Sequence, residues 1–324
     1  MALDDTITGL HHVTVIAGDA QENLDFYAGV LGMRLVKKTV NQDVPGTYHL
    51  FYADGAAHAG TDLTFFPWPD MEPGRAGVGL TVEVALAVPT GSLEYWTDRL
   101  VHYGIRVHQP FARFGERLLA FTDPHGVRLA LVETAADREF TPWARSSVPE
   151  PSQIRGLHGV RLLERSAAAT VAFLTGTLGF EEIGQEDGWR RFALSGERSG
   201  RVLDIKEAPG EPQGTWGIGS VHHIAWRVPD DATELAVQRR LQGAGRHPTD
   251  VIDRFWFKSV YFREPGGALF EIATDGPGFG VDEPLEELGA RLVLPPWLEP
   301  RRALIEAGLP PLREPEPAGH ESRR

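Results

Sequence analysis

Two matching phrases lie far apart in this chain of 324 residues: Gly9-Leu10-His11-His12-Val13 and Ser220-Val221-His222-His223-Ile224. A third apolar stretch, Ala268-Leu269-Phe270-Glu271-Ile272, carries a carboxylate inside a strand-like run. Two imidazoles and one carboxylate on short apolar strands form a ligand set that binds one face of a divalent metal and leaves the other face open. The sequence therefore predicts a metalloenzyme.

The composition excludes several other classes of protein. The 45 acidic and 32 basic residues give a formal charge of -13, which repels nucleic acid and anionic membrane surfaces. Because the chain has no cysteine, nitrogen and oxygen atoms must hold any metal. The N-terminal segment has no basic region followed by an apolar core, and no apolar run approaches the roughly 20 residues that span a membrane. We therefore expect a cytoplasmic protein with no nucleic-acid or membrane partner.

A fourfold repeat organises the chain. Helix-like stretches end at glycines 72, 75 and 66 residues apart, namely Gly32, Gly104, Gly179 and Gly245. A glycine just beyond the last periodic residue is the usual left-handed end of a helix. The candidate N-caps of these helices are Asp19, Ser92, Ser166 and Asp230. One strand precedes each helix and three shorter strands follow it, so the sequence predicts the order βαβββ four times.

The region between the second and third modules is typical of a linker. Residues 136–155 are rich in proline and serine. We therefore divide the chain into residues 1–150 and 151–280, with two βαβββ modules each, and a C-terminal tail, 281–324. The predicted fold class is α+β, with the modules paired into two domains that have curved, partly open mixed β-sheets. We expect the tail to pack on the body through Trp297 and Leu298.

Comparison of the modules indicates which of them keep the metal ligands. In the third module Gly159 stands in the place of His12, and in the second module Ala130 stands in the place of Glu271. A full set therefore remains only as His12, His223 and Glu271. For these to meet, modules 1 and 4 must pack together as the metal barrel, and modules 2 and 3 must form a metal-free partner barrel.

Each of the three ligands alone fits a core histidine or a surface carboxylate better than a metal ligand. The His-His pair at equivalent positions of two modules, together with a carboxylate in an apolar strand, reverses that preference. A buried charge without a partner is costly, and a cation supplies the partner.

Residues beside the ligands are candidates for acid–base or binding roles. His11 and His222 point to the opposite face of their strands unless a β-bulge redirects them. Tyr261 lies opposite Glu271 if the intervening turn has a three-residue loop, and does not if the loop has two residues.

Three further side chains complete the candidates. Arg254 could hold a developing anion, but an arginine next to Asp253 fits a surface ion pair equally well. His49 is a weaker candidate for the pocket wall. Asp204, on an apolar strand of the third module, is interpreted as structural.

Four phrases carry a resemblance to a known family, at residues 9–14, 48–54, 222–225 and 265–271. They resemble those of the ring-cleaving hydroquinone dioxygenases of the vicinal oxygen chelate superfamily, which includes glyoxalase I and the extradiol catechol dioxygenases. The resemblance covers about residues 7–312. It implies the vicinal oxygen chelate fold and Fe(II), with Mn(II) as the alternative, held by His12, His223 and Glu271. It also implies that His11, Arg254 and Tyr261 contact or protonate an aromatic substrate.

The expected function is that of a metal-dependent dioxygenase that inserts O2 into a hydroquinone- or catechol-type ring, in the degradation of aromatic compounds. Its partners are then a small aromatic substrate and O2, and self-association into a homo-oligomer stays open. One alternative is a glyoxalase-type isomerase or lyase with Zn(II) or Ni(II). Such sites commonly add a second glutamate, whereas the first module has Leu63, Thr64 and Phe65 at that place. The other alternative is a metal-free protein that binds an aromatic compound.

Overall fold

The computed structural model describes residues 6–135, 138–196 and 199–315, and the order βαβββ recurs along them as predicted. The first module contains β1 (Gly9–Ala17), α1 (Ala20–Leu24) with its π-helical end η1 (Asp25–Val30), β2 (Arg34–Val40), β3 (Tyr48–Ala53) and β4 (Asp62–Pro67). The second contains β5 (Leu80–Pro89), α2 (Leu93–His102), β6 (Phe111–Arg113), β7 (Glu116–Thr122) and β8 (Arg128–Thr134).

The other two modules repeat this order. The third contains β9 (Gly156–Glu164), α3 (Ala168–Phe173) with η3 (Leu174–Leu178), β10 (Glu181–Glu186), β11 (Trp189–Ala193) and β12 (Val202–Glu207). The fourth contains β13 (Val221–Val228), α4 (Asp231–Gly243), β14 (Ile252–Asp253), β15 (Lys258–Arg263) and β16 (Leu269–Thr274).

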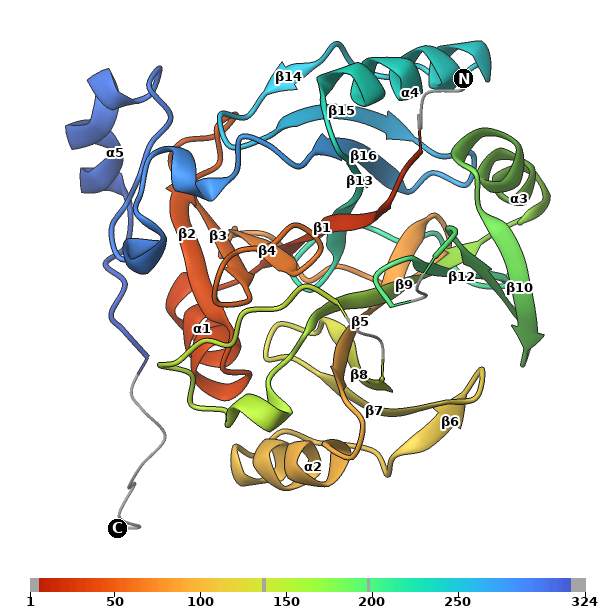
Figure 1. Cartoon of the computed structure of the whole chain (residues 1–324), viewed down its shortest axis with the longest axis horizontal. Helices are drawn as coiled ribbons and strands as arrows, with labels where there is room; N and C mark the ends of the chain where they lie inside the picture. The colour runs from red at the N-terminus through yellow and green to blue at the C-terminus, as the bar shows by residue number, and fades with distance from the viewer. Residues whose placement is uncertain (1–5, 136–137, 197–198, 316–324) are drawn as a thin grey trace.

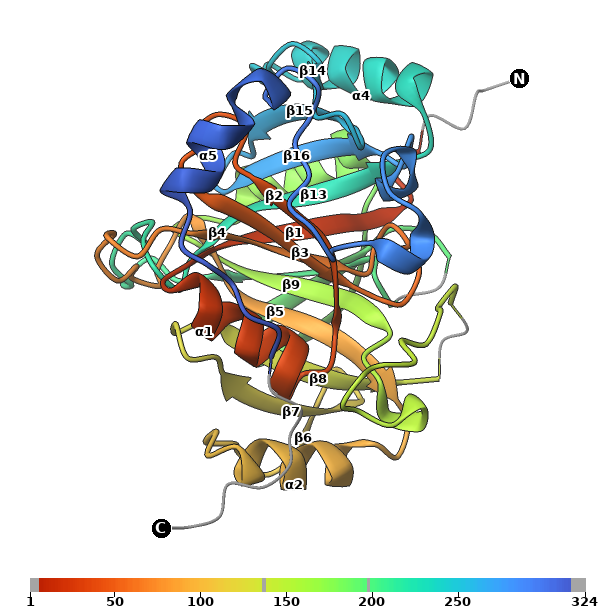
Figure 2. The ribbon, with the colours of Figure 1, turned by 90° about the vertical axis from the view of Figure 1, so that its left-hand side faces the viewer.

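The described strands form two curled eight-stranded sheets, with the orders β14-β15-β16-β13-β1-β4-β3-β2 and β10-β11-β12-β9-β5-β8-β7-β6. Antiparallel pairs join the modules, β1 with β13 and β5 with β9 (Figures 1 and 2). The first sheet thus combines modules 1 and 4, and the second combines modules 2 and 3, as expected from the lost ligands. Each sheet takes strands from both sides of residue 150, and the division into sequence domains there stays a prediction.

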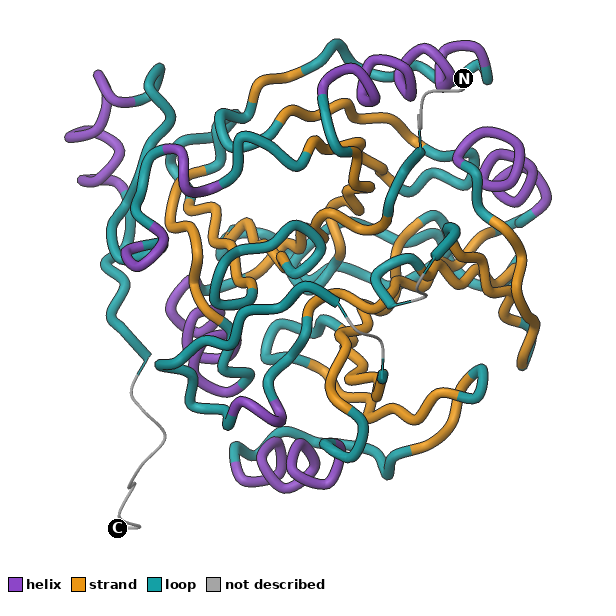
Figure 3. Tube along the Cα trace, in the orientation of Figure 1, coloured by secondary structure: helices purple, strands orange, loops and turns teal. Residues whose placement is uncertain are grey.

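The helices lie around the outside of the two sheets (Figure 3). All four helix-ending glycines are left-handed, with φ of 68°, 74°, 80° and 72° at Gly32, Gly104, Gly179 and Gly245. Asp19, Ser92 and Asp230 occupy N-cap positions as predicted. The prediction for Ser166 is wrong, because α3 has Ala167 at its N-cap and the Ala167 N–H donates to the carboxylate of Glu207 on β12.

The inner faces of the helices and both sheets share one hydrophobic core. Trp96 and Leu100 of α2 and Val237 of α4 are fully buried in it. Leu235 of α4 is 41 % exposed and lies outside that core. Among the described residues no helix has the length and apolar composition needed to cross a membrane.

The segment after β16 packs back onto the first sheet. The ammonium of Lys37, which is fully buried on β2, binds Asp282 at 2.9 Å and also pairs with Glu283. Further on, η6 (Glu299–Arg301) and α5 (Arg302–Gly308) follow. Leu298 is buried as predicted. Trp297 is 48 % exposed but contacts Phe255 edge-on, with 6.2 Å between the ring centroids. The end of the predicted tail, residues 316–324, lies outside the described residues.

Candidate metal centre

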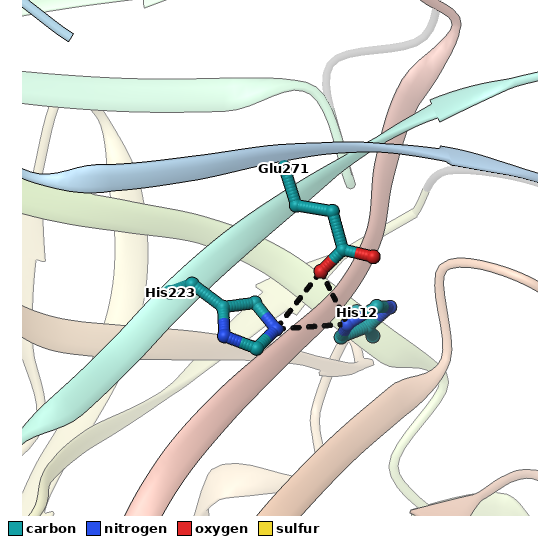
Figure 4. Close-up of side chains that lie close together, drawn as sticks. All are labelled: His12, His223 and Glu271. Carbon is teal, nitrogen blue, oxygen red and sulfur yellow. Dashed lines mark hydrogen bonds and ion pairs between the residues drawn. The ribbon is translucent and has the colours of Figure 1, made fainter. Parts of the chain in front are cut away.

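Three buried side chains from three strands of the first sheet converge on one point (Figure 4). His12 lies on β1, His223 on β13 and Glu271 on β16. The Nε2 atoms of the two histidines are 3.2 Å apart, and Glu271 Oε2 is 3.2 Å from the first and 2.9 Å from the second. Modules 1 and 4 therefore bring together the three residues that the sequence analysis selected.

With the proton of each histidine on Nδ1, the three facing atoms all carry lone pairs and none can donate to another. Burial opposes ionisation of Glu271, but His12 and His223 outweigh it and hold the pKa of its carboxyl well below its usual value. Burial in turn lowers the pKa of His223. Glu271 Oε2 has no hydrogen-bond donor within the described parts of the chain. A carboxylate oxygen and two imidazole lone pairs at this separation repel one another, and a divalent cation fits the donor set.

Both histidine pairs are shaped by β-bulges. The register of β1 with β13 shifts by one residue between Leu10 and His12, where His11 has no partner. It shifts again after Thr14, because Thr14 pairs with His223 but Val15 pairs with Val221. His11 and His222 are therefore the extra residues of the two bulges, which turn them toward the ligands instead of the opposite face. This is the condition that the sequence analysis left open for both residues.

Each ligand histidine is hydrogen-bonded to the histidine before it. The Nδ1 atoms of His11 and His12 are 2.9 Å apart, and those of His222 and His223 are 2.8 Å apart. Burial, and then the neighbouring ligand, lower the pKa of His11 and of His222 to about 3, so both rings are neutral near pH 7. A neutral ring can accept the Nδ1–H of the ligand histidine, which leaves the ligand's Nε2 lone pair for a metal.

The outer histidines are held by different surroundings. His11 has a further hydrogen bond to the backbone of Thr274 and packs against Phe257 at 5.2 Å between ring centroids. His222 stacks on Trp216, with 4.6 Å between centroids and 21° between planes. Phe257 and Thr274 are far from His11 in the chain, so no local pattern indicates that contact, whereas Trp216 lies close to His222 in sequence.

A pocket of about 400 Å³, including its open mouth, leads to His12 and His223. Aromatic rings form much of its wall, namely Phe51, Phe66, Trp256 and Phe257, and polar side chains lie around it, namely Asn41, Gln42, Asp43, His49, Arg254 and Tyr261. A concave, largely apolar site with a few polar groups is typical of small-molecule binding. A larger hollow of about 1380 Å³, also including its open mouth, lies against β7 and β8, but no metal-ligand cluster was found there among the described residues.

Tyr261 and Arg254 form a polar pair in this pocket. Tyr261 on β15 pairs directly with Glu271 on β16, because the turn between them closes through Glu264 and Ala268 around a three-residue loop. Arg254 hydrogen-bonds Tyr261, and its guanidinium carbon lies 5.5 Å from the centre of the Tyr261 ring. Burial raises the pKa of Tyr261 above its usual value, so the phenol stays protonated.

The ion-pair partner of Arg254 is Asp43. Arg254 Nη2 lies 3.1 Å from Asp43 Oδ2, in the loop between β2 and β3, whereas Asp253 caps the N–H of Phe255. Burial opposes the charge on Arg254, but Tyr261 and Asp43 outweigh it and raise its pKa. Of the two alternatives left open, the surface pair with Asp253 is not formed, and Arg254 lines the pocket.

Several site residues escaped the sequence analysis. Ser259 donates a 2.5 Å hydrogen bond to Glu271 Oε1, and its spacing of two from Tyr261 on β15 was the available signal. Trp256 and Phe257 are buried in the loop between β14 and β15 and line the pocket. Their apolar character alone does not distinguish them from core residues.

The second sheet replaces the equivalent site with ion pairs. In strand register, Arg161 of β9 takes the place that Thr14 has on β1. Its register partner Glu83 corresponds to His223, and its register partner Asp204 corresponds to Thr64. Arg161 Nε is 3.4 Å from Asp204 Oδ2, and Asp204 Oδ1 accepts from Arg191 at 2.8 Å. At Gly159 an added Cβ would lie 2.9 Å from the Val202 carbonyl oxygen, so this position has no room for a histidine.

The fold and the site together define the class of protein. The chain matches the Glyoxalase/Bleomycin resistance protein/Dioxygenase superfamily over residues 9–131 and 156–272, and it belongs to that superfamily.

Its relatives include ring-cleaving enzymes by name. "Putative ring-cleaving dioxygenase MhqO" of Bacillus subtilis strain 168 is 43% identical over 303 residues, which cover 94% of this chain and 96% of the relative. "Chlorohydroquinone/hydroquinone 1,2-dioxygenase" of Sphingobium indicum is 34% identical over 307 residues, 92% of this chain and 95% of the relative.

Solved structures agree with the fold. The crystal structure titled as a putative dioxygenase from Bacillus subtilis has a TM-score of 0.92 at 42% identity, and the match covers 96% of this chain and 99% of that chain. Glyoxalase I from Zea mays has a TM-score of 0.61 at 15% identity, over 82% of this chain and 92% of that chain, which indicates a shared fold.

Proposed function

We propose that this protein is a mononuclear ring-cleaving dioxygenase that uses Fe(II), or Mn(II), to insert O2 into a hydroquinone- or catechol-type ring. The observation that carries the proposal is the buried His12, His223 and Glu271 set at the inner end of an aromatic pocket. The names of the relatives support the same reaction class.

A divalent metal held by the triad would supply Lewis acidity toward a ring hydroxyl and a binding face for O2. The protein's own contribution is to orient the ring and to handle protons. Because a guanidinium has only donors, Tyr261 accepts from Arg254, and its own O–H can be directed to an oxygen of the substrate. We assign Tyr261 as the proton donor in the pocket and Arg254 as the cation beside a developing phenolate.

His11 receives a positioning role in this proposal. Its ring lies behind His12, and its Nδ1 is occupied by His12 Nδ1. With its pKa lowered to about 3 by burial, His11 is a neutral imidazole near pH 7 and does not act as an imidazolium acid. Its hydrogen bond instead orients the imidazole of His12.

The isomerase alternative calls for one more carboxylate ligand. Among the described residues the metal-ligand cluster contains His12, His223 and Glu271 alone. The first-module strand that would carry a second glutamate has Thr64, whose hydroxyl bonds to Thr14 at 2.7 Å. Three protein ligands favour the oxygen chemistry of the main proposal.

The test is anaerobic purification with metal analysis, followed by oxygen-electrode assays with hydroquinone, methylhydroquinone and catechol after Fe(II) or Mn(II) is restored. We expect metal-dependent O2 uptake in a one-to-one ratio to the diol consumed, with a ring-opened product. A protein that binds metal and consumes no O2 with any of these diols contradicts the proposal. Thiol adducts with Zn(II) and Ni(II) would then test the isomerase alternative.

Replacement of a ligand links this activity to the triad. His12→Ala should lose bound metal and at least a thousandfold in turnover, because two ligands cannot retain the ion. His247→Ala, a change at an exposed histidine of the same module pair, should keep both. Retained metal and full activity in His12→Ala would overturn the ligand assignment.

A further inference from the structure

His49 stands in the wall of the pocket without a role in the chemistry described so far. It lies on β3, and its ring packs between two aromatic side chains, with centroid separations of 3.9 Å to Phe51 and 4.4 Å to Phe66. It lines the same pocket as His12 and His223. The ring is therefore held in one place with its edge available to a bound molecule.

A short chain of hydroxyls fixes the orientation of this ring. His49 Nε2 lies 2.9 Å from Thr64 Oγ1, which lies 2.7 Å from Thr14 Oγ1. Each threonine hydroxyl can donate one hydrogen bond and also accept, so the direction of this chain can run either way. His49 can consequently present either a lone pair or an N–H at Nδ1.

The Nδ1 atom of His49 has no hydrogen-bond partner among the described residues, although its neighbours in the pocket are engaged. Gln42 donates to the carbonyl oxygen of Arg254 at 2.9 Å, and Arg254 is bound to Asp43 and Tyr261. Burial, and then His12, lower the pKa of His49 well below its usual value, so the ring is neutral. A neutral, oriented and uncommitted polar group in a largely aromatic wall is suited to a neutral hydroxyl.

We propose that His49 binds the second oxygen of an aromatic diol, the one that does not approach the metal site, and so selects diols over monophenols. This inference deepens the proposed function and depends on it for the identity of the ligand. One hydroxyl would be held at His12, His223 and Glu271, and the flat ring would lie between the aromatic walls. The other hydroxyl then meets His49 Nδ1. A monophenol that filled the pocket would leave that atom desolvated and unpaired, which is the strongest source of discrimination available to a polar site.

The test measures binding, so that it does not depend on turnover. Dissociation constants for hydroquinone and for 4-methylphenol, which lacks the second hydroxyl but has a similar shape, are measured anaerobically on the Mn(II)-loaded protein. In His49→Phe, which keeps a ring between Phe51 and Phe66, we expect hydroquinone to bind about 10- to 100-fold more weakly. The affinity for 4-methylphenol should not fall and is expected to rise, because the variant has no Nδ1 atom to leave unpaired.

His49→Asn is the rescue variant, because its side-chain amide reaches the position of Nδ1 and should regain part of the lost affinity. Metal content and circular dichroism of both variants should match the wild type. Equal weakening of the two ligands in His49→Phe overturns the inference, and so does an unchanged affinity for hydroquinone.

The two proposals fail in different ways. If hydroquinone binds in a manner that depends on His49 but supports no O2 uptake, the dioxygenase proposal fails and the role of His49 stands. If the wild type turns over hydroquinone and His49→Phe binds it as well as the wild type does, the role of His49 fails and the dioxygenase proposal stands.

Discussion

A histidine that binds a metal must present the lone pair of one ring nitrogen toward it. Here the preceding histidine can fix the tautomer that leaves this lone pair on Nε2. When His12 donates its Nδ1–H to His11 and His223 donates its Nδ1–H to His222, both Nε2 atoms are left as acceptors facing Glu271. The same His-His phrase thus provides a ligand and the group that sets its tautomer. This explains why the phrase occurs twice, once for each imidazole.

His11→Phe tests this pairing. Loss of the Nδ1 partner should weaken metal binding about 10- to 100-fold, as is typical when a group that orients a metal ligand is removed. The fold should be kept, because the phenylalanine ring can still pack on Phe257. Competition with a chelator measures the affinity. His108→Phe, at an exposed histidine near the second sheet, is the matched control. Equal affinity in the two variants would show that His11 does not orient the ligand.

Tyr261→Phe separates proton delivery from metal binding. The variant should keep its metal, because Ser259 still donates to Glu271, and should lose about 10²-fold in kcat, because the donated proton is gone. Steady-state O2 uptake and metal content are the two measurements. Tyr95→Phe removes a similar contact, 3.2 Å to Arg99, far from the site and should leave kcat unchanged. A normal kcat in Tyr261→Phe would assign proton transfer to another group.

At the level of strands, the two sheets use the same positions for opposite purposes. The first sheet keeps histidines and threonines facing the candidate metal site, while the second fills the equivalent face with Arg161, Asp204 and Glu83. A duplicated module without these candidate ligands must still satisfy the polar face of its sheet. The ion pairs do so because each charged group on this face finds a partner of opposite charge.

Asp204→Ala should destabilise the protein by about 1–3 kcal/mol, because it removes the 2.8 Å carboxylate partner of the buried Arg191. Arg191 keeps its pair with Glu116, which limits the loss. Urea unfolding measures the free energy. Glu182→Ala, which breaks the more exposed pair with Arg190 in the same module, should cost at most about 1 kcal/mol. A loss no larger at Asp204 than at Glu182 would mean that the network adds no stability.

The features of this site that could be predicted are those that a short stretch of sequence shows. Features that depend on contacts between distant segments could not be predicted. Gly159 and Ala130 are visible as substitutions in a repeat, so the choice of ligands and the pairing of modules follow from sequence. The bulges at His11 and His222 depend on the register between β1 and β13, strands separated by some two hundred residues. Likewise the pairing of Arg254 with Asp43 joins two loops that no local pattern connects.

Across the whole molecule, a buried pair of carboxyl groups connects the two sheets. Glu164 ends β9 of the second sheet, and Glu264 lies in the turn before β16 of the first. Glu264 accepts 2.7 Å hydrogen bonds from Thr170 and from the Gly266 and Ala268 N–H groups. Glu164 approaches so closely that a Cβ at Gly266 would lie 1.6 Å from its Oε2.

As a carboxylate, Glu164 has no hydrogen-bond donor among the described residues, whereas as a carboxylic acid it can donate to Glu264. Burial, and then the charge of Glu264, raise the pKa of Glu164 from 4.5 to about 8. The folded protein therefore keeps a proton at this junction that the unfolded chain has lost. Loss of that proton should therefore weaken the contact between the sheets.

This junction predicts how the stability of the protein varies with pH. Below pH 4.5 both the folded and the unfolded chain hold the proton, and Glu164 makes its full contribution to the free energy of unfolding. Between pH 4.5 and about 8 that free energy falls by up to about 1.4 kcal/mol per pH unit. Above pH 8 the contribution of Glu164 is lost. Glu164→Gln should remove this loss, because its amide donates to Glu264 at every pH.

We expect melting temperatures of Glu164→Gln and wild type to be similar at pH 5, with the variant several degrees higher at pH 8.5. Glu94→Gln, at an exposed position on α2, should follow the wild type throughout. The comparison between variants at each pH cancels the pH dependence of metal binding, which is common to all three proteins. If the gap between Glu164→Gln and wild type stays constant from pH 5 to 8.5, the carboxyl pair does not hold a proton, and the two sheets are joined at this point by packing alone.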